Sequence, residues 1–131
     1  MYKIISELES MGDSGFNVGR ILQRKNLHSQ KFDEATVRKL NHMLDLVDVA
    51  IDSMIANLKE GFHHVINISN AQDAEHDINE YRDNLKEEHL RNIESEESSY
   101  LRGVYYMDLV SECERVGDFI INVSEALVEL N

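Results

Sequence analysis

The clearest helical pattern in the chain lies in residues 37–58, which read VRKLNHMLDLVDVAIDSMIANL. Apolar side chains recur there in alternating steps of three and four residues, the spacing that keeps one face of an α-helix apolar. This spacing predicts a long helix packed lengthwise against its neighbours, with Asp33 capping its start and Gly61 ending it. The residues of the stripe are Val37, Leu40, Leu44, Val47, Ile51, Met54 and Leu58.

Three further segments carry helical patterns, and short polar linkers join them. They are residues 2 to about 25, 69 to about 93, and 98 to the end, and Ser69–Gln72 fits a capping box. Short connections between long helices favour antiparallel neighbours. The sequence therefore predicts an all-α fold, an up-down antiparallel four-helix bundle. Its expected core gathers Leu40, Leu44, Val47, Ile51, Val116, Ile120 and Val123.

The third segment differs from the others because its apolar stripe is thin. Glu75, Arg82 and His89 fall at the spacing of its inner face. Such a helix is either partly exposed or contains a polar network, and the sequence is compatible with both. In the fourth segment the single cysteine, Cys113, falls on the apolar stripe and is expected to be a small core residue.

The amino-acid composition of the chain limits the classes of molecule that it is expected to bind. The length of 131 residues suits one domain, and 13 basic against 25 acidic residues give a formal net charge of −12. This charge disfavours nucleic acid, anionic lipid and free phosphate, because proteins bind such anions largely through Lys and Arg. It favours cations. A lone cysteine favours a reducing compartment, and the sequence has no run of eighteen apolar residues that would span a membrane.

One unusual phrase is written twice. Residues 6–22 read SELESMGDSGFNVGRIL, and residues 111–127 read SECERVGDFIINVSEAL, at an offset of 105. Both copies fit the pattern E-x-E-x-h-G-D-x-x-x-N, in which h is an apolar residue. On a helix, the second Glu, the Asp and the Asn of each copy project from one face. These residues are Glu9, Asp13 and Asn17 in the first copy and Glu114, Asp118 and Asn122 in the second.

The chemistry of the phrase points to a cation. Like charges four residues apart destabilise a helix by roughly 0.2–0.5 kcal/mol, and a glycine within a helix costs roughly 0.5–1 kcal/mol more. The glycine fits a place where another backbone or a ligand comes close, and clustered carboxylates with an amide oxygen fit a hard cation. The alternative is a strip of solvated surface charge. We predict metal ligands at Glu9, Asp13, Glu114 and Asp118, with Asn17 and Asn122 behind them.

The second copy of the phrase resembles the signature of PhoU-like domains, an acidic E-x-x-x-D within an E-R-h-G-D-x-x-x-N helix, and the first looks like a degenerate copy. Residues 75–90, EHDINEYRDNLKEEHL, resemble the preceding helix in the cytoplasmic C-terminal domains of bacterial sodium/phosphate cotransporters. The resemblance is strong over residues 73–127 and weak over 26–68. It implies three-helix repeats, so that the single domain 1–131 would hold the end of one repeat in 1–25 and a complete repeat in 33–131.

By the same resemblance, the domain would bind iron, zinc or another divalent or ferric metal through the E-x-x-x-D carboxylates. It would regulate phosphate uptake by contacting a membrane transporter, in the same or another chain, from the cytoplasmic side of the cell membrane. Homo-oligomers are compatible with it, and no enzyme activity is expected. Phe119 stands where the family often has His, and Ser10 stands where the second copy has Arg115, so the first site is expected to be the weaker.

Three interpretations follow from these observations. The first is the regulatory domain of a sodium-dependent phosphate cotransporter, with residue 1 marking a cut in a longer chain. The second is a free-standing PhoU-like metalloregulator of phosphate transport. The third is a purely structural helical assembly domain whose carboxylates hold no metal.

Overall fold

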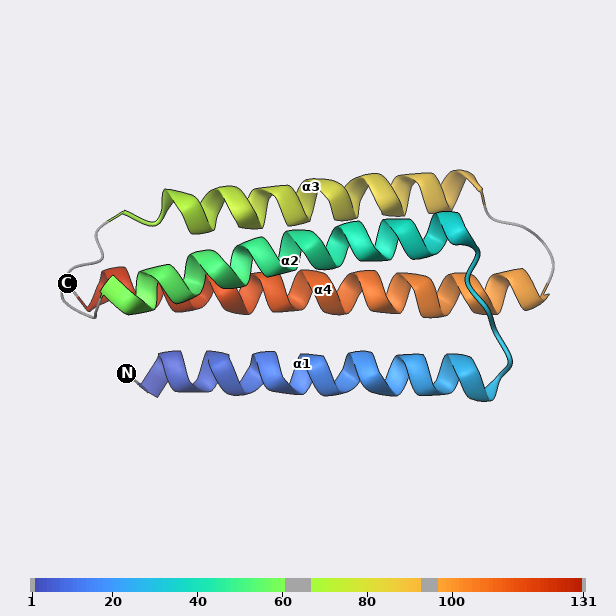
Figure 1. The fold of residues 1–131 in the computed structure, drawn as a ribbon, viewed down its shortest axis with the longest axis horizontal. Coiled ribbons are helices and arrows are strands. Elements are labelled where there is room, and N and C mark those ends of the chain that lie inside the picture. Colours follow the sequence, from blue (N-terminus) through green and yellow to red (C-terminus); the bar gives the residue numbers. More distant parts are fainter. Residues whose placement is uncertain (1, 61–66, 93–96, 131) are drawn as a thin grey trace.

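The computed structural model describes residues 2–60, 67–92 and 97–130. Four helices make up this part of the chain, and they run alternately up and down (Figure 1), as the sequence predicts. None of the helices in these ranges is both long enough and apolar enough to cross a membrane. The helices are α1 (Tyr2–Leu27), α2 (Glu34–Glu60), α3 (Ser69–Arg91) and α4 (Glu97–Glu129).

Local polar contacts explain where two of the helices begin. The Asp33 side chain accepts a hydrogen bond from the backbone N–H of Thr36 at 2.8 Å, which confirms the predicted cap of α2 and lowers the pKa of Asp33. The predicted capping box at Ser69 is wrong. Residue Ile68 precedes α3 without a side-chain cap, and the Asn67 side chain accepts the N–H of Ser69 at 2.9 Å. The predicted helix end at Gly61 lies outside the described residues.

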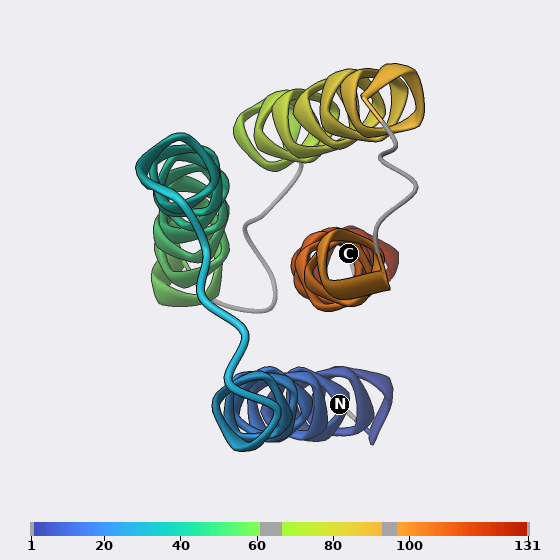
Figure 2. The ribbon, with the colours of Figure 1, turned by 90° about the vertical axis from the view of Figure 1, so that its right-hand side faces the viewer.

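Helix α4 is the central element of the bundle. It contacts α1, α2 and α3, and α2 also contacts α3, whereas the described part of α1 contacts α4 alone (Figure 2). Because three helices cover it, α4 is buried around most of its circumference. Its most deeply buried side chains are Val110, Ile120, Val123, Ser124 and Leu127.

The core of α2 is shifted by about one residue from the predicted stripe. Leu44, predicted in the core, is 47% exposed, and Leu40, Ile51 and Val116 are only partly buried. The cause is the missing contact between α1 and α2: the flank of α2 opposite α3 lies on the side of α1, which does not touch it (Figure 2). Val47 and Met54 are buried as predicted, and the other buried residues of α2 are Met43, Ala50 and Asn57.

The glycines of the repeated phrase have different surroundings. A Cβ atom on Gly117 of α4 would lie 3.2 Å from Cδ1 of Ile78, a fully buried residue of α3. The close approach expected from the sequence is therefore confirmed for this copy. A Cβ atom on Gly12 of α1 would meet no heavy atom within 4 Å. One copy packs against a helix, and the other faces open space.

Candidate functional site

The two copies of the phrase hold α1 and α4 together. The Asn122 side chain donates a hydrogen bond to Glu7 at 3.3 Å, and the Asn17 side chain donates one to Glu112 at 3.5 Å. The first Glu of each copy thus accepts from the Asn of the other copy, which is the pattern of a local two-fold axis between antiparallel helices. Asn17 and Asn122, predicted to support metal ligands, bridge the two helices in this structure.

Glu112 also borders a hollow of about 450 Å³ between α1 and α4. This glutamate is buried, and its Oε1 atom lies 3.4 Å from the Arg115 guanidinium. Its Oε2 atom has no hydrogen-bond partner among the residues that the structure describes. Burial and the Glu112 charge raise the pKa of Asp108, one turn away, while Arg24 of α1 opposes that rise. The seam therefore holds two neighbouring carboxyl groups, with Arg20, Arg24 and Arg115 around the hollow.

The raised pKa of Asp108 has a testable consequence for stability. The folded state keeps this proton at pH values where the unfolded chain has lost it, so the unfolding free energy falls as pH rises above the ordinary value of 3.8. We expect Asp108→Asn to raise the unfolding free energy at neutral pH and to change it little near about pH 3, where both side chains are neutral. Urea unfolding at the two pH values measures this.

The matched control for this measurement is Asp45→Asn, on α2, which lies outside the α1–α4 seam. We expect that variant to show a smaller pH-dependent difference from the parent chain. If Asp108→Asn changes the unfolding free energy by the same amount at both pH values, the assigned effect on the pKa of Asp108 would be contradicted.

The seam between α3 and α4 contains a polar network. This network explains why the apolar stripe of α3 is thin. Glu75, Arg82 and His89 are all partly buried at seven-residue intervals. Arg82 forms an ion pair with Glu114 of α4, and its guanidinium also lies 2.9 Å from Asp83. Glu114 is therefore turned towards α3, and its charge is already matched by a cation of the chain.

A second pair of carboxyl groups lies along the same seam. Burial, and then the charge of Asp118, raise the pKa of Glu75. Burial, and then Glu114, raise the pKa of Asp118, against the opposing charge of Arg82. The structure thus brings Glu75 of α3 close to the E-x-x-x-D pair of α4. A bound cation would relieve this repulsion, but it would have to compete with Arg82.

The E-x-x-x-D pair of the first copy lies apart from this seam. Glu9 and Asp13 are both exposed on α1, which contacts neither α2 nor α3 within the described ranges. The two predicted pairs therefore do not converge on one site. In residues 2–60, 67–92 and 97–130, no group of three or more His, Cys, Asp or Glu side chains is arranged to hold a metal ion. The three carboxylates of the α3–α4 seam fit a metal only in part, because Arg82 occupies one of them.

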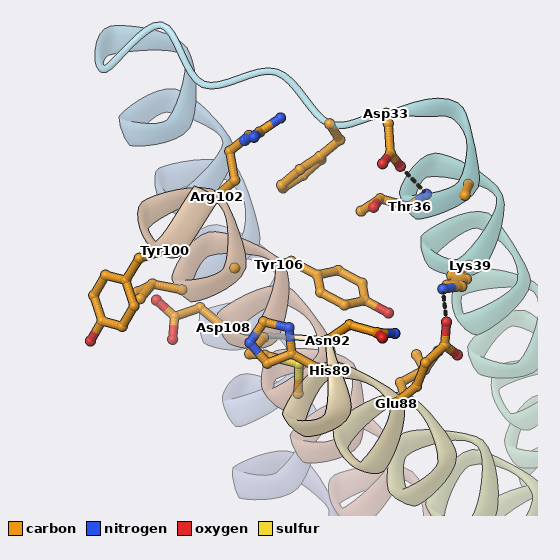
Figure 3. Close-up of a pocket in the computed structure, with 16 residues that line it drawn as sticks. Asp33, Thr36, Lys39, Glu88, His89, Asn92, Tyr100, Arg102, Tyr106 and Asp108 are labelled. Atoms are coloured by element: carbon orange, nitrogen blue, oxygen red, sulfur yellow. Dashed lines mark hydrogen bonds and ion pairs between the residues drawn. The ribbon is translucent and has the colours of Figure 1, made fainter. Parts of the chain in front are cut away.

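A hollow of about 500 Å³ lies where α2 begins and α3 ends (Figure 3). Lys39 of α2 forms an ion pair with Glu88 of α3 across it. The His89 ring packs edge-on against Tyr106, with centroids 6.1 Å apart, and lies so close to Gly103 that a Cβ atom there would come within 2.6 Å of it. The lining combines matched charges with aromatic rings.

Sequence reasoning missed several of these residues. Glu7 and Glu112 were part of the repeated pattern, so their shared position was a usable indication of a common role. The residues around the end hollow come from three separate helices, and no local pattern unites them. Cys113 is buried as predicted, and burial raises its pKa to about 11, so it is a protonated thiol at neutral pH.

A comparison with models of known protein families identifies the family of this chain. The sequence model of the PhoU domain matches residues 40–127, which run from the first turns of α2 to the end of the repeated phrase in α4. Comparisons with curated proteins and with solved structures find no match. The matched region covers more than half of the chain and includes the α3–α4 seam. The chain therefore belongs to the PhoU domain family, whose members are regulatory rather than catalytic proteins of phosphate transport and can bind metals.

Proposed function

We propose that this chain is the cytoplasmic regulatory domain of a sodium-dependent phosphate cotransporter and modulates phosphate uptake by contacting the membrane portion. The observation that carries the regulatory role is the PhoU match over residues 40–127. The resemblance of residues 75–90 to the helix found in cotransporter domains supports the choice of transporter. The net charge of −12 supports action on a protein partner rather than capture of phosphate.

In this proposal, α1 is the end of one three-helix repeat, and residues 33–131 form a complete repeat. The phrase shared by α1 and α4 supports this division, as do the reciprocal bonds Asn122–Glu7 and Asn17–Glu112. The two helices would then hold equivalent places in successive repeats.

The proposed metal site lies at the α3–α4 seam, with Glu114 and Asp118 as ligands. Glu75 adds a third carboxyl group from α3, and burial together with the neighbouring carboxylates raises the pKa values of Glu75 and Asp118, which supports a cation at this seam. By the resemblance to PhoU-like domains, the ion would be a divalent or ferric one such as iron or zinc, held by these carboxylate oxygens. Glu9 and Asp13 would form a weaker site, because both side chains are exposed on α1, whereas Glu114 is partly buried against α3.

The experiment that tests the function measures phosphate uptake into membrane vesicles that contain a sodium-dependent phosphate cotransporter. Adding the 131-residue chain to the cytoplasmic face should change the sodium-driven uptake rate and leave sodium-driven uptake of an unrelated solute unchanged. Unchanged phosphate uptake at saturating chain concentration would reject the proposal.

A free-standing PhoU-like metalloregulator is the second candidate. The same PhoU match favours it, since that match does not distinguish between transporter types. Vesicles that carry an ATP-driven phosphate transporter separate the two candidates, because only the second candidate is expected to act there. A domain that changes uptake in neither preparation would fit the third candidate, a structural assembly domain.

A further inference from the structure

The hollow between α1 and α4 is bordered by a buried carboxyl group that lacks one partner. Glu112 is 9% exposed, and its side chain lines this hollow of about 450 Å³. Its Oε1 atom lies near Asn17 and Arg115, whereas no hydrogen bond reaches its Oε2 atom from the residues that the structure describes. A buried oxygen without a donor costs free energy, because it has lost water and gained nothing in return. A ligand that donates a hydrogen bond to Glu112 would remove this cost.

Three arginines surround the same hollow. Arg20 and Arg24 come from α1, and Arg115 comes from α4. Neither Arg20 nor Arg24 forms an ion pair within the described part of the chain, and Arg24 acts on Asp108 only through its charge. The three arginines outnumber the two carboxyl groups of the hollow, Asp108 and Glu112. The hollow is therefore locally positive in a chain whose net charge is −12.

We propose that this hollow binds inorganic phosphate in a form that still carries a proton. The ligand has to accept hydrogen bonds from several arginines and also donate one to a carboxylate. A protonated phosphate does both, because its bare oxygens accept from guanidinium groups, whose geometry matches phosphate, and its P–OH group donates to Glu112. A carboxylate turns readily about its terminal bond, so either oxygen of Glu112 can meet the ligand. Asn17 and Ser111 line the hollow as uncharged donors.

Helices packed on the outer side of α1 would leave this hollow open. The positions of α4 that match Arg20 and Arg24 at the offset of 105 are Glu125 and Glu129. Both glutamates are exposed, although α2 and α3 pack against α4. By the same arrangement, two further helices on α1 would leave Arg20 and Arg24 accessible. The comparison also shows that the related end of the seam is acidic, so that the end with Glu112 is the one suited to an anion.

Glu112 gives the hollow a means of choosing between anions. At about pH 8, sulfate carries no proton and a phosphate monoester carries almost none. Each of these anions would place bare oxygens against the Glu112 carboxylate. Inorganic phosphate keeps a proton at this pH and meets the carboxylate with a hydrogen bond. A site that sets like charges against the wrong ligand discriminates against it.

The proposal goes beyond the regulatory role and does not rest on it, because binding is a property of the chain alone. The net charge of −12 repels anions at long range. The affinity for phosphate would therefore come from the close contacts in the hollow. Since those contacts come from both helices, bound phosphate would hold α1 against α4.

The first experiment is calorimetric titration of the metal-free 131-residue chain with inorganic phosphate, glycerol phosphate and sulfate, at about pH 8 and constant ionic strength. We expect saturable binding of inorganic phosphate and at least about tenfold weaker binding of the other two anions. Arg24→Gln should weaken phosphate binding at least about tenfold. Arg38→Gln, at an exposed position of α2 outside the hollow, should leave it unchanged.

Circular dichroism verifies that both arginine variants are folded. The proposal would be overturned by a parent chain that shows no saturable phosphate binding, by equal affinities for the three anions, or by equal losses in the two variants.

The second experiment tests the role of Glu112. Glutamine keeps an acceptor for Asn17 and Arg115, but it has no charge and its amide can donate to an anion. Glu112→Gln should therefore reduce the preference for phosphate over sulfate to about threefold or less. In the parent chain, phosphate should shift the backbone amide resonances of residues 17–24 and 108–115 most strongly. A variant that keeps the full preference, or shifts that concentrate at the α3–α4 seam, would show that phosphate does not lie against Glu112, and the proposal would be wrong.

Discussion

Replacing Met43 by alanine is expected to lower the unfolding free energy by about 2–5 kcal/mol, whereas Leu44→Ala is expected to lower it by about 0.5 kcal/mol or less. The two residues are neighbours on α2, but Met43 is fully buried and Leu44 is 47% exposed. Truncating Met43 removes apolar contacts and leaves a cavity inside the bundle. Truncating Leu44 leaves no cavity, and alanine is a slightly better helix former than leucine.

Urea unfolding monitored by circular dichroism measures both changes. The pair forms its own control, because the introduced alanine, the helix and the conditions match. Similar losses at the two positions would mean that α2 is rotated from the orientation described above, or that something covers the Leu44 flank in solution.

Metal binding at the α3–α4 seam is expected to stabilise the chain by about 2.7 kcal/mol when the free metal is at one hundred times its dissociation constant. This follows because only the folded state brings the seam carboxylates together. Asp118→Asn and the double variant Glu114→Gln/Asp118→Asn should remove most of that gain. Glu9→Gln/Asp13→Asn should have a smaller effect, since those side chains are exposed and apart from the seam.

Thermal melting of chelated and metal-loaded protein measures the gain for each variant against its own chelated form. This reference is needed because Glu114→Gln also breaks the ion pair with Arg82 and so destabilises the metal-free chain. Asp118→Asn keeps that ion pair and relieves the repulsion with Glu75. If all the variants keep the metal response of the parent chain, the acidic strip is solvated charge and the metal proposal fails.

The helices themselves could be predicted because their determinants are local. The steps of three and four in residues 37–58 and the cap at Asp33 are properties of a few adjacent residues, and α2 was found at Glu34–Glu60. The exposure of Leu44 could not be predicted in this way. The exposure of Leu44 depends on whether α1 contacts α2, and the sequence of α2 does not indicate whether that contact forms. An apolar stripe predicts that a face has a partner but does not say which helix provides it.

The candidate site shows the same limit. The phrase correctly predicted a close approach at Gly117, since glycine within a helix is costly unless something needs the space. It did not predict that Glu114 pairs with Arg82, because that contact joins α4 to a helix 32 residues earlier in the chain. Nor did it show that Asn17 and Asn122 cross between α1 and α4. Whether the carboxylates bind metal stays a prediction.

The attachment of α1 to α4 alone has a consequence for motion within the native state. Contacts such as Asn122–Glu7 join residues 115 positions apart, so the entropy of closing a long loop opposes their formation. Opening of such a segment requires less free energy than global unfolding. Backbone amides of α1 should therefore exchange with deuterium well before those in the centre of α4, which three helices protect. A binding event that pulls α1 away could expose one side of α4 while α2, α3 and α4 remain folded together.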